Sequence, residues 1–187
     1  IAFEIVIVLA EGSPRLRCAM EKAYKAGRLR AIGVSNFQQV DIENLMQNGD
    51  VKPMVNQILA HVSNTPFPLI DYCHKHDILV EAYSPMGHGE MMKNTLVQDM
   101  AKQYGVSVAQ LCIRYCLQLN MLPLPKTANP KHMESNADVN FEISAQDMET
   151  LKNAERIKNY GEASLFPVYG GKLDEKGNYT PGDFFND

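Results

Sequence analysis

Polar side chains stand at the ends of four short apolar runs in this sequence, where they could hold a small molecule. They are Ser35 and Asn36, Asn56 and Gln57, Tyr83 and Ser84, and Lys126 and Thr127. The amides of Asn36 and Gln57 offer a donor and an acceptor to a ligand amide, and Tyr83 offers a ring face. Backbone N–H groups at the start of a helix near Pro130 favour an anion. A single Asn at such a place is often only a turn cap, but four polar ends in succession favour a shared binding role.

The elements that carry these residues alternate along the chain. Apolar runs predict strands at 30–34, 55–59, 79–83 and 122–124, with one more at 3–9. Amphipathic periodicity predicts helices at 15–26, 40–47, 69–76, 96–104, 108–119, 130–137 and 146–157. Such alternation predicts an α/β fold with a parallel sheet, whose ligands sit at the carboxyl ends of the strands.

The length limits how much of a barrel this sequence can build. A (β/α)8 TIM barrel needs about 250 residues, whereas this chain has 187. We therefore expect a partial barrel of four to five βα units. We expect a single domain over residues 1–187, in which 159–187 form a long loop or a covering segment.

Composition narrows the class of protein. The net charge is −4, and the basic residues form no stripe, so a nucleic-acid partner is not expected. The apolar stretch at 5–10 is too short to span a bilayer, and no basic residue precedes it as in a signal peptide. Four cysteines without a disulfide-like spacing favour reduced thiols and a cytoplasmic location.

Four segments together resemble the second half of an aldo-keto reductase. They are "GRLRAIGVSNF" at 27–37, "VNQILAH" at 55–61, "VEAYSPMGHG" at 80–89 and "LPLPKTANPKHMESN" at 122–136. The resemblance runs from about residue 20 to residue 151. It implies a (β/α)8 barrel that reduces aldehydes or ketones with a nicotinamide cofactor, usually NADPH, and without a metal.

The resemblance also implies a role for each strand end. Ser35, Asn36 and Gln57 would hydrogen-bond the nicotinamide carboxamide, and Tyr83 would stack on the nicotinamide ring. At the other end of the cofactor, more residues would contribute. Ser84, Met86 and Gly89 would surround the pyrophosphate. Lys126 and Thr127 would bind the adenosine ribose and its 2′-phosphate, and Asn136 would contact the adenine.

Two departures from the family pattern lie at the phosphate end. His132 stands where the family commonly has Arg, and Ser135 stands where it usually has Glu. A neutral His lacks the planar fork with which Arg holds a phosphate. The resemblance implies NADP as the cofactor, and these departures make NAD an alternative.

The family's catalytic Asp, Tyr, Lys and His come from the first half of its barrel, and the resemblance does not cover them. The first 60 residues contain no His and the first 40 contain no Asp. We expect a truncated chain that carries mainly the cofactor site, and we assign no catalytic residue. Exposed strand edges would then favour self-association. The alternative is a non-catalytic nucleotide-binding or interaction protein on the same scaffold.

Other groupings favour structural roles. Cys73, His74 and His76 have a spacing that suggests zinc, but on a helix they do not share one face. Cys112 and Cys116 lie one helical turn apart and indicate core packing. His61 is expected in a loop and His88 at the surface. In the tail, Phe166 and Tyr169 are candidates for substrate contact or for surface packing.

Overall fold

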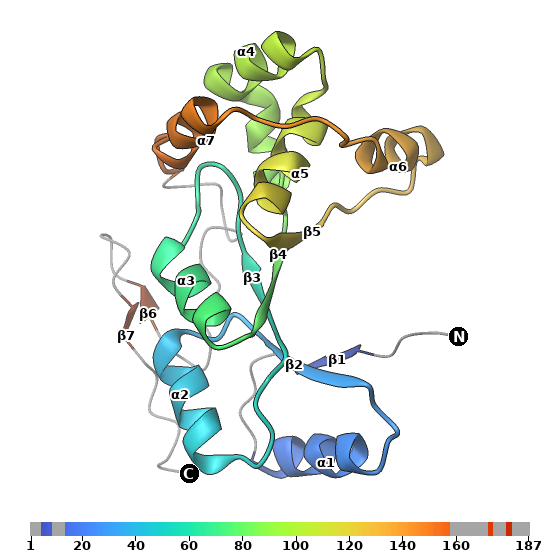
Figure 1. The fold of residues 1–187 in the computed structure, drawn as a ribbon, viewed down its shortest axis with the longest axis vertical. Helices are drawn as coiled ribbons and strands as arrows, with labels where there is room; N and C mark the ends of the chain where they lie inside the picture. The colour runs from blue at the N-terminus through green and yellow to red at the C-terminus, as the bar shows by residue number, and fades with distance from the viewer. Residues whose placement is uncertain (1–4, 9–13, 158–171, 174–178, 181–187) are drawn as a thin grey trace. The chain divides into compact units, whose positions relative to one another are not determined.

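The computed structural model describes residues 5–8, 14–157, 172–173 and 179–180, with side chains for 16–157. Figure 1 shows the strands and helices following one another along the chain. The described residues fall into two compact units. The first contains the described residues up to Ile58, Pro68–Leu79 and the short described stretches 172–173 and 179–180. The second contains Leu59–Phe67 and the described residues from Val80 to 157.

Parallel strands and their connecting helices make up most of the first unit. Its strands are β1 (Ile5–Val8), β2 (Ala31–Ser35) and β3 (Val55–Leu59), and its helices are α1 (Pro14–Lys25), α2 (Gln39–Asn48) and α3 (Phe67–Lys75). β2 pairs in parallel with β1 and with β3. β2 is buried from Ile32 to Ser35, as expected for a parallel strand covered on both faces. Gly33 permits the close approach to β3, because a Cβ there would lie 2.9 Å from Val55 Cβ.

The second unit continues the same pattern. Its elements are β4 (Leu79–Tyr83), η1 (Gly87–Lys93), α4 (Thr95–Tyr104), α5 (Val108–Gln118), β5 (Met121–Leu124), α6 (Pro130–Ala137) and α7 (Ala145–Lys152). β4 and β5 pair in parallel, and α5 packs against β5, α4 and α6. Ser107 and Gln110 form a capping box that starts α5. The core includes Val80 and Leu111, which are fully buried.

The structure confirms the α/β class with parallel strands and corrects one local prediction. The helix expected over 146–157 ends at Lys152. There Asn153 Nδ2 donates to Glu149 O over 2.8 Å, and the Ile157 N–H donates to Ser63 O over 3.3 Å. The segment "SPMGHG" after β4 runs into the 3₁₀ helix η1.

Part of the expected tail at 159–187 is described. It contains a short antiparallel pair, formed by β6 (Lys172–Leu173) and β7 (Tyr179–Thr180). Phe166 and Tyr169 lie outside the described residues, so their expected substrate contact stays a prediction. The expectation of one domain over 1–187 also stays a prediction.

Candidate functional site

The carboxyl end of β2 is held against β3 by hydrogen bonds. Ser35 and Gln57 are register partners in the β2–β3 ladder. Ser35 Oγ donates to Gln57 O over 3.1 Å, and the Asn36 N–H donates to the same oxygen over 2.8 Å. Ser35 is buried, whereas Asn36 and Gln57 are half-buried. The first unit thus brings together the three residues expected at the nicotinamide.

Backbone conformation marks two strand ends. Asn36 directly follows β2 with φ +59°, and Ser84 directly follows β4 with φ +51°. Asp77 and Asn120 also have positive φ, but they come just after α3 and α5, where a left-handed residue commonly ends a helix. Strained residues that follow strands are typical of ligand sites. The positive φ at these two strand ends is therefore the backbone feature that favours a ligand site there.

The side chain of Asn56, the neighbour of Gln57, is fully buried and hydrogen-bonds within the protein. Asn56 Nδ2 donates to Phe37 O over 2.9 Å and lies 3.8 Å from Cys73 Sγ. Because successive side chains of a strand point to opposite faces, Asn56 and Gln57 have different surroundings. Asn56 therefore supports the turn after β2 from within the first unit.

A tight turn follows β4 in the second unit. The Gly87 N–H donates to Ser84 O over 2.7 Å, and the Gly89 N–H donates to Met86 O over 3.0 Å. Ser84 Oγ lies 3.1 Å from the Nε2 of His88, which is exposed. Gly89 has φ +93°, and a Cβ there would meet none of the described atoms within 4 Å. The turn thus presents backbone that a ligand could approach closely.

His61 packs against the inner side of this turn, at Gly87. It lies in a loop, as expected, between β3 and α3, and it is fully buried there; a Cβ on Gly87 would lie 3.3 Å from its Cε1 atom. Burial, followed by the nearby charges of His88 and Arg156, lowers the pKa of His61 to about 4. His61 O accepts a 2.9 Å hydrogen bond from Thr65 Oγ1. His61 is thus a neutral packing residue under the turn, not a surface base.

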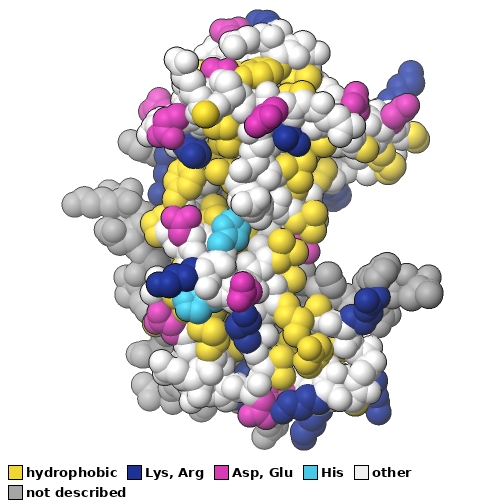
Figure 2. Space-filling model, in the orientation of Figure 1, with side chains coloured by type: hydrophobic (Ala, Val, Ile, Leu, Met, Phe, Trp, Pro, Cys, Tyr) yellow, Lys and Arg dark blue, Asp and Glu magenta, His cyan; other side chains and the backbone are white. Residues whose placement is uncertain are grey.

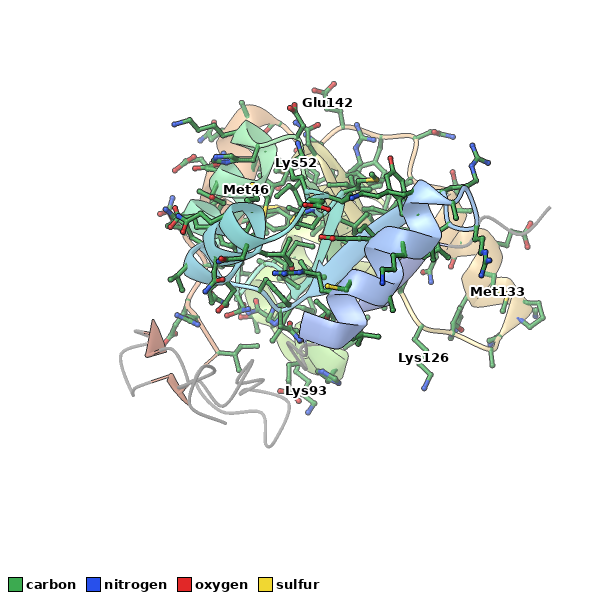
Figure 3. The ribbon with its side chains drawn as sticks, turned by 90° about the horizontal axis from the view of Figure 1, so that it is seen from below. Met46, Lys52, Lys93, Lys126, Met133 and Glu142 are labelled. Atoms are coloured by element: carbon green, nitrogen blue, oxygen red, sulfur yellow. The ribbon has the colours of Figure 1, made fainter. Side chains whose placement is uncertain are left out.

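The residues expected at the ribose and 2′-phosphate lie around the start of α6. Lys126 is exposed and extends away from the ribbon (Figure 3). Thr127 Oγ1 accepts from the Asn129 N–H over 3.1 Å. Asn129 Oδ1 in turn accepts from the Lys131 N–H over 3.0 Å. One helix N–H that could bind an anion is therefore already taken by the N-cap.

Two further expected cofactor residues lie within α6, none of whose residues is buried. His132 is exposed and Asn136 is half-buried. Ser135 Oγ donates to His132 O over 3.3 Å. Both side chains therefore lie where solvent or a ligand could reach them.

The cysteine and histidine groupings have structural surroundings. No group of three His, Cys, Asp or Glu side chains within the described residues could hold a metal ion. His76 Nδ1 lies 2.8 Å from Tyr72 O, and its ring lies against the Tyr72 ring at 4.2 Å. Burial raises the pKa of the Cys112 thiol to about 12 and that of Cys116 further. Both thiols are therefore core residues.

The charged side chains of the described residues do not mark out one surface as a binding site. On the face drawn in Figure 2, basic and acidic side chains of the described residues are interspersed.

Among the described residues, no helix is long and apolar enough to cross a membrane.

Solved structures of similar shape identify the fold class. An aldo-keto reductase enzyme from a Medee basin deep-sea metagenome library matches with a TM-score of 0.80 and 27% identity. The match covers 89% of this chain and 63% of that one. A Bombyx mori aldo-keto reductase in complex with NADP matches with a TM-score of 0.65 and 30% identity, over 71% of this chain and 47% of the other. The chain is thus an α/β protein with the fold of part of an aldo-keto reductase barrel.

Sequence comparisons then identify the family. The model of the aldo/keto reductase family matches residues 16–96 and 90–156. A glyoxal reductase of Bacillus subtilis is 39% identical over 152 residues, 79% of this chain and 55% of the relative. An uncharacterized oxidoreductase of Schizosaccharomyces pombe is 43% identical over 137 residues, 72% of this chain and 50% of the relative. This chain belongs to the aldo/keto reductase family, and it spans about half the length of these curated relatives.

Proposed function

We propose that this chain carries the cofactor site of an NAD(P)H-dependent aldo-keto reductase that reduces an aldehyde or a ketone. The observation that carries the proposal is the turn after β2, where Asn36 is held at φ +59° between Ser35 and the β3 residue Gln57. Family membership and the solved relatives in complex with NADP or NADPH support the choice of cofactor. The bound cofactor would supply the hydride.

The turn after β2 fits a carboxamide. The Ser35 hydroxyl donates to Gln57 O, so toward a ligand it acts through its oxygen as an acceptor for an amide N–H. The amides of Asn36 and Gln57 offer both donor and acceptor groups. These three residues would bind the nicotinamide carboxamide, and Tyr83 would cover one face of the ring. The ring orientation would then decide which face delivers hydride.

The turn after β4 and the start of α6 would hold the rest of the cofactor. Ser84, Met86 and Gly89 would surround the pyrophosphate, to which small residues allow close backbone approach. Lys126 and Thr127 would bind the ribose and its 2′-phosphate, beside His132. Asn136 would contact the adenine. The exposed positions of Lys126 and His132 are compatible with this role.

Cofactor preference is tested by His132→Arg. Arginine presents two parallel N–H donors to a phosphate, whereas a neutral imidazole presents one. We expect the variant to tighten NADPH by about tenfold, since hydrogen bonds to charged groups contribute about 1.5–3 kcal/mol, and to leave NADH nearly unchanged. Calorimetric titration of both cofactors measures this difference. Equal changes for the two cofactors would contradict a phosphate beside His132.

The nicotinamide site is tested by Asn36→Gly. Glycine adopts positive φ without strain, so this variant keeps the backbone and removes only the amide. We expect about tenfold weaker NADPH binding, the effect of about 1.4 kcal/mol. Asn120→Gly is the matched control, because Asn120 also has positive φ and lies outside the proposed site. Equal NADPH affinity of the two variants would refute the assignment of Asn36.

Turnover separates the reductase from a non-catalytic nucleotide-binding or interaction protein. The general acid of an aldo-keto reductase protonates the developing alkoxide, and no residue of this chain is assigned that role. We therefore expect carbonyl-dependent oxidation of NADPH only when a half-barrel of a relative supplies the catalytic residues. Binding without turnover under that condition would favour the non-catalytic alternative.

We also propose a cytoplasmic location. The four cysteines are free, and all but Cys18 are buried, a state typical of reducing compartments. Fractionation of cells that produce the protein tests this location, and recovery in an oxidising compartment would contradict it.

A further inference from the structure

We infer that Asn56 is a positioning residue, which holds the turn at Ser35, Asn36 and Phe37 in the shape that a nicotinamide site needs. This inference deepens the proposed function and rests on it. Asn56 itself would not touch the cofactor, because its side chain is fully buried. It would act through the backbone of Phe37.

Three consecutive residues of the turn are each hydrogen-bonded to one of two neighbouring residues of β3. Ser35 Oγ and the Asn36 N–H donate to Gln57 O over 3.1 and 2.8 Å. Phe37 O accepts from Asn56 Nδ2 over 2.9 Å. The dipeptide Asn56–Gln57 thus holds the turn on both sides of Asn36.

The bond to Phe37 matters because Asn36 is strained. Non-glycine residues at positive φ persist only where the surrounding structure imposes that conformation, and Asn36 has φ +59°. Gln57 O fixes the N-terminal side of Asn36 through its own N–H. Asn56 Nδ2 fixes the residue that follows. Without the second anchor, the turn is free to relax toward an unstrained conformation and to move the Asn36 amide.

An amide is an unfavourable side chain at this place in the core. Asn56 Oδ1 is buried and has no hydrogen-bond partner among the described residues. A buried polar atom in that state destabilises the fold, and an apolar side chain of similar volume would avoid the cost. The Nδ2 bond to Phe37 O is the contribution that an apolar side chain could not make.

Amide hydrogen exchange of the free protein tests whether Asn56 holds the turn. Asn56→Leu and Asn56→Ala both remove the Nδ2 donor. Leucine fills the space of the amide, whereas alanine leaves it empty. We expect the Asn36 N–H to exchange at least tenfold faster in both variants, with amides of α5 unchanged. Cys73→Ala is the matched control, since it perturbs packing beside Asn56 and keeps the bond to Phe37. An unchanged Asn36 rate in Asn56→Leu overturns the inference.

Ligand titration tests the consequence for the site. NADPH carries the nicotinamide, and adenosine 2′,5′-bisphosphate does not. If the competent turn is populated only a tenth of the time in Asn56→Leu, NADPH affinity falls by about tenfold, while the bisphosphate affinity stays within about twofold. Equal weakening of both ligands, or the same selective loss in Cys73→Ala, overturns the positioning role. If the unmutated chain binds neither ligand, the proposed function fails, while hydrogen exchange still decides whether Asn56 holds the turn.

Discussion

At the scale of single residues, the two supports of the candidate site are fully buried, whereas most residues that would touch a ligand are half-buried or exposed. Asn56 and His61 are fully buried, each under a turn that follows a strand. Asn56 holds Phe37 O, and His61 packs against Gly87. Their side chains are polar, so each carries a hydrogen-bonding or protonation requirement into the core. The site therefore depends on groups that a ligand would not reach.

The burial of His61 predicts a pH dependence of stability. Its pKa is lowered from 6.5 to about 4 in the fold, so the unfolded chain binds a proton more readily. Stability is then present above pH 6.5 and is lost as pH falls toward 4, by roughly 2 kcal/mol at pH 5. His61→Gln removes this titration. Urea unfolding at pH 7.5 and pH 5 should show a smaller difference for the variant, and equal differences would contradict the account.

Residue types alone predict the candidate site but not its supports. Asn56 and Gln57 are adjacent polar residues at the end of one strand, and the sequence gives no sign of which one faces the core. That choice depends on the packing of α3, whose Cys73 lies 3.8 Å from Asn56 Nδ2. His61 lies in the expected loop between β3 and α3, but the sequence gives no sign that it is buried there. Its burial arises from the chain folding back at Gly87, a contact between residues distant in sequence.

At the scale of elements, the strand ends were predictable because apolar runs and polar ends are local features. The bounds of β3, β4 and α6 agree with the sequence prediction. α7 is shorter than its periodicity indicated, because Asn153 caps it; farther along the chain the Ile157 N–H donates to Ser63 O rather than to a helix carbonyl. The two-residue strands β6 and β7 carry too little pattern for prediction.

The close contact of β2 and β3 predicts the effect of Gly33→Ala. The added Cβ would lie 2.9 Å from both Val55 Cβ and Val55 O, so the strands must separate. We expect a loss of about 1–3 kcal/mol in the free energy of unfolding, together with faster exchange of the Asn36 amide. Gly105→Ala is the control, because its cost comes from positive φ at the end of α4 and leaves Asn36 exchange unchanged. Unaltered Asn36 exchange in Gly33→Ala would show that the strands accommodate the methyl group.

At the scale of the whole molecule, the chain belongs to a family of barrel proteins. Its last described parallel strand, β5, exposes apolar side chains. On β5, Leu122 and Leu124 are 42% and 36% exposed. Within the described part of the chain, β5 pairs only with β4. An open, apolar strand edge favours pairing with another strand. We propose that two copies of this chain associate through β5.

Sedimentation velocity at micromolar concentration tests this association. We expect a dimer for the chain as given and a monomer for Leu124→Lys, because a charge on an edge strand opposes pairing. Leu16→Lys is the control, since Leu16 is 43% exposed but lies on α1. A folded monomer of the unmutated chain would contradict the proposal.

The central claim, that the polar strand ends bind one nicotinamide dinucleotide, is tested most directly by an NADPH titration followed in amide ¹H–¹⁵N spectra. The account predicts that the signals of Asn36, Gln57, Ser84 and Thr127 shift together, with a single dissociation constant. Shifts confined to other residues, or none at saturating NADPH, would contradict it.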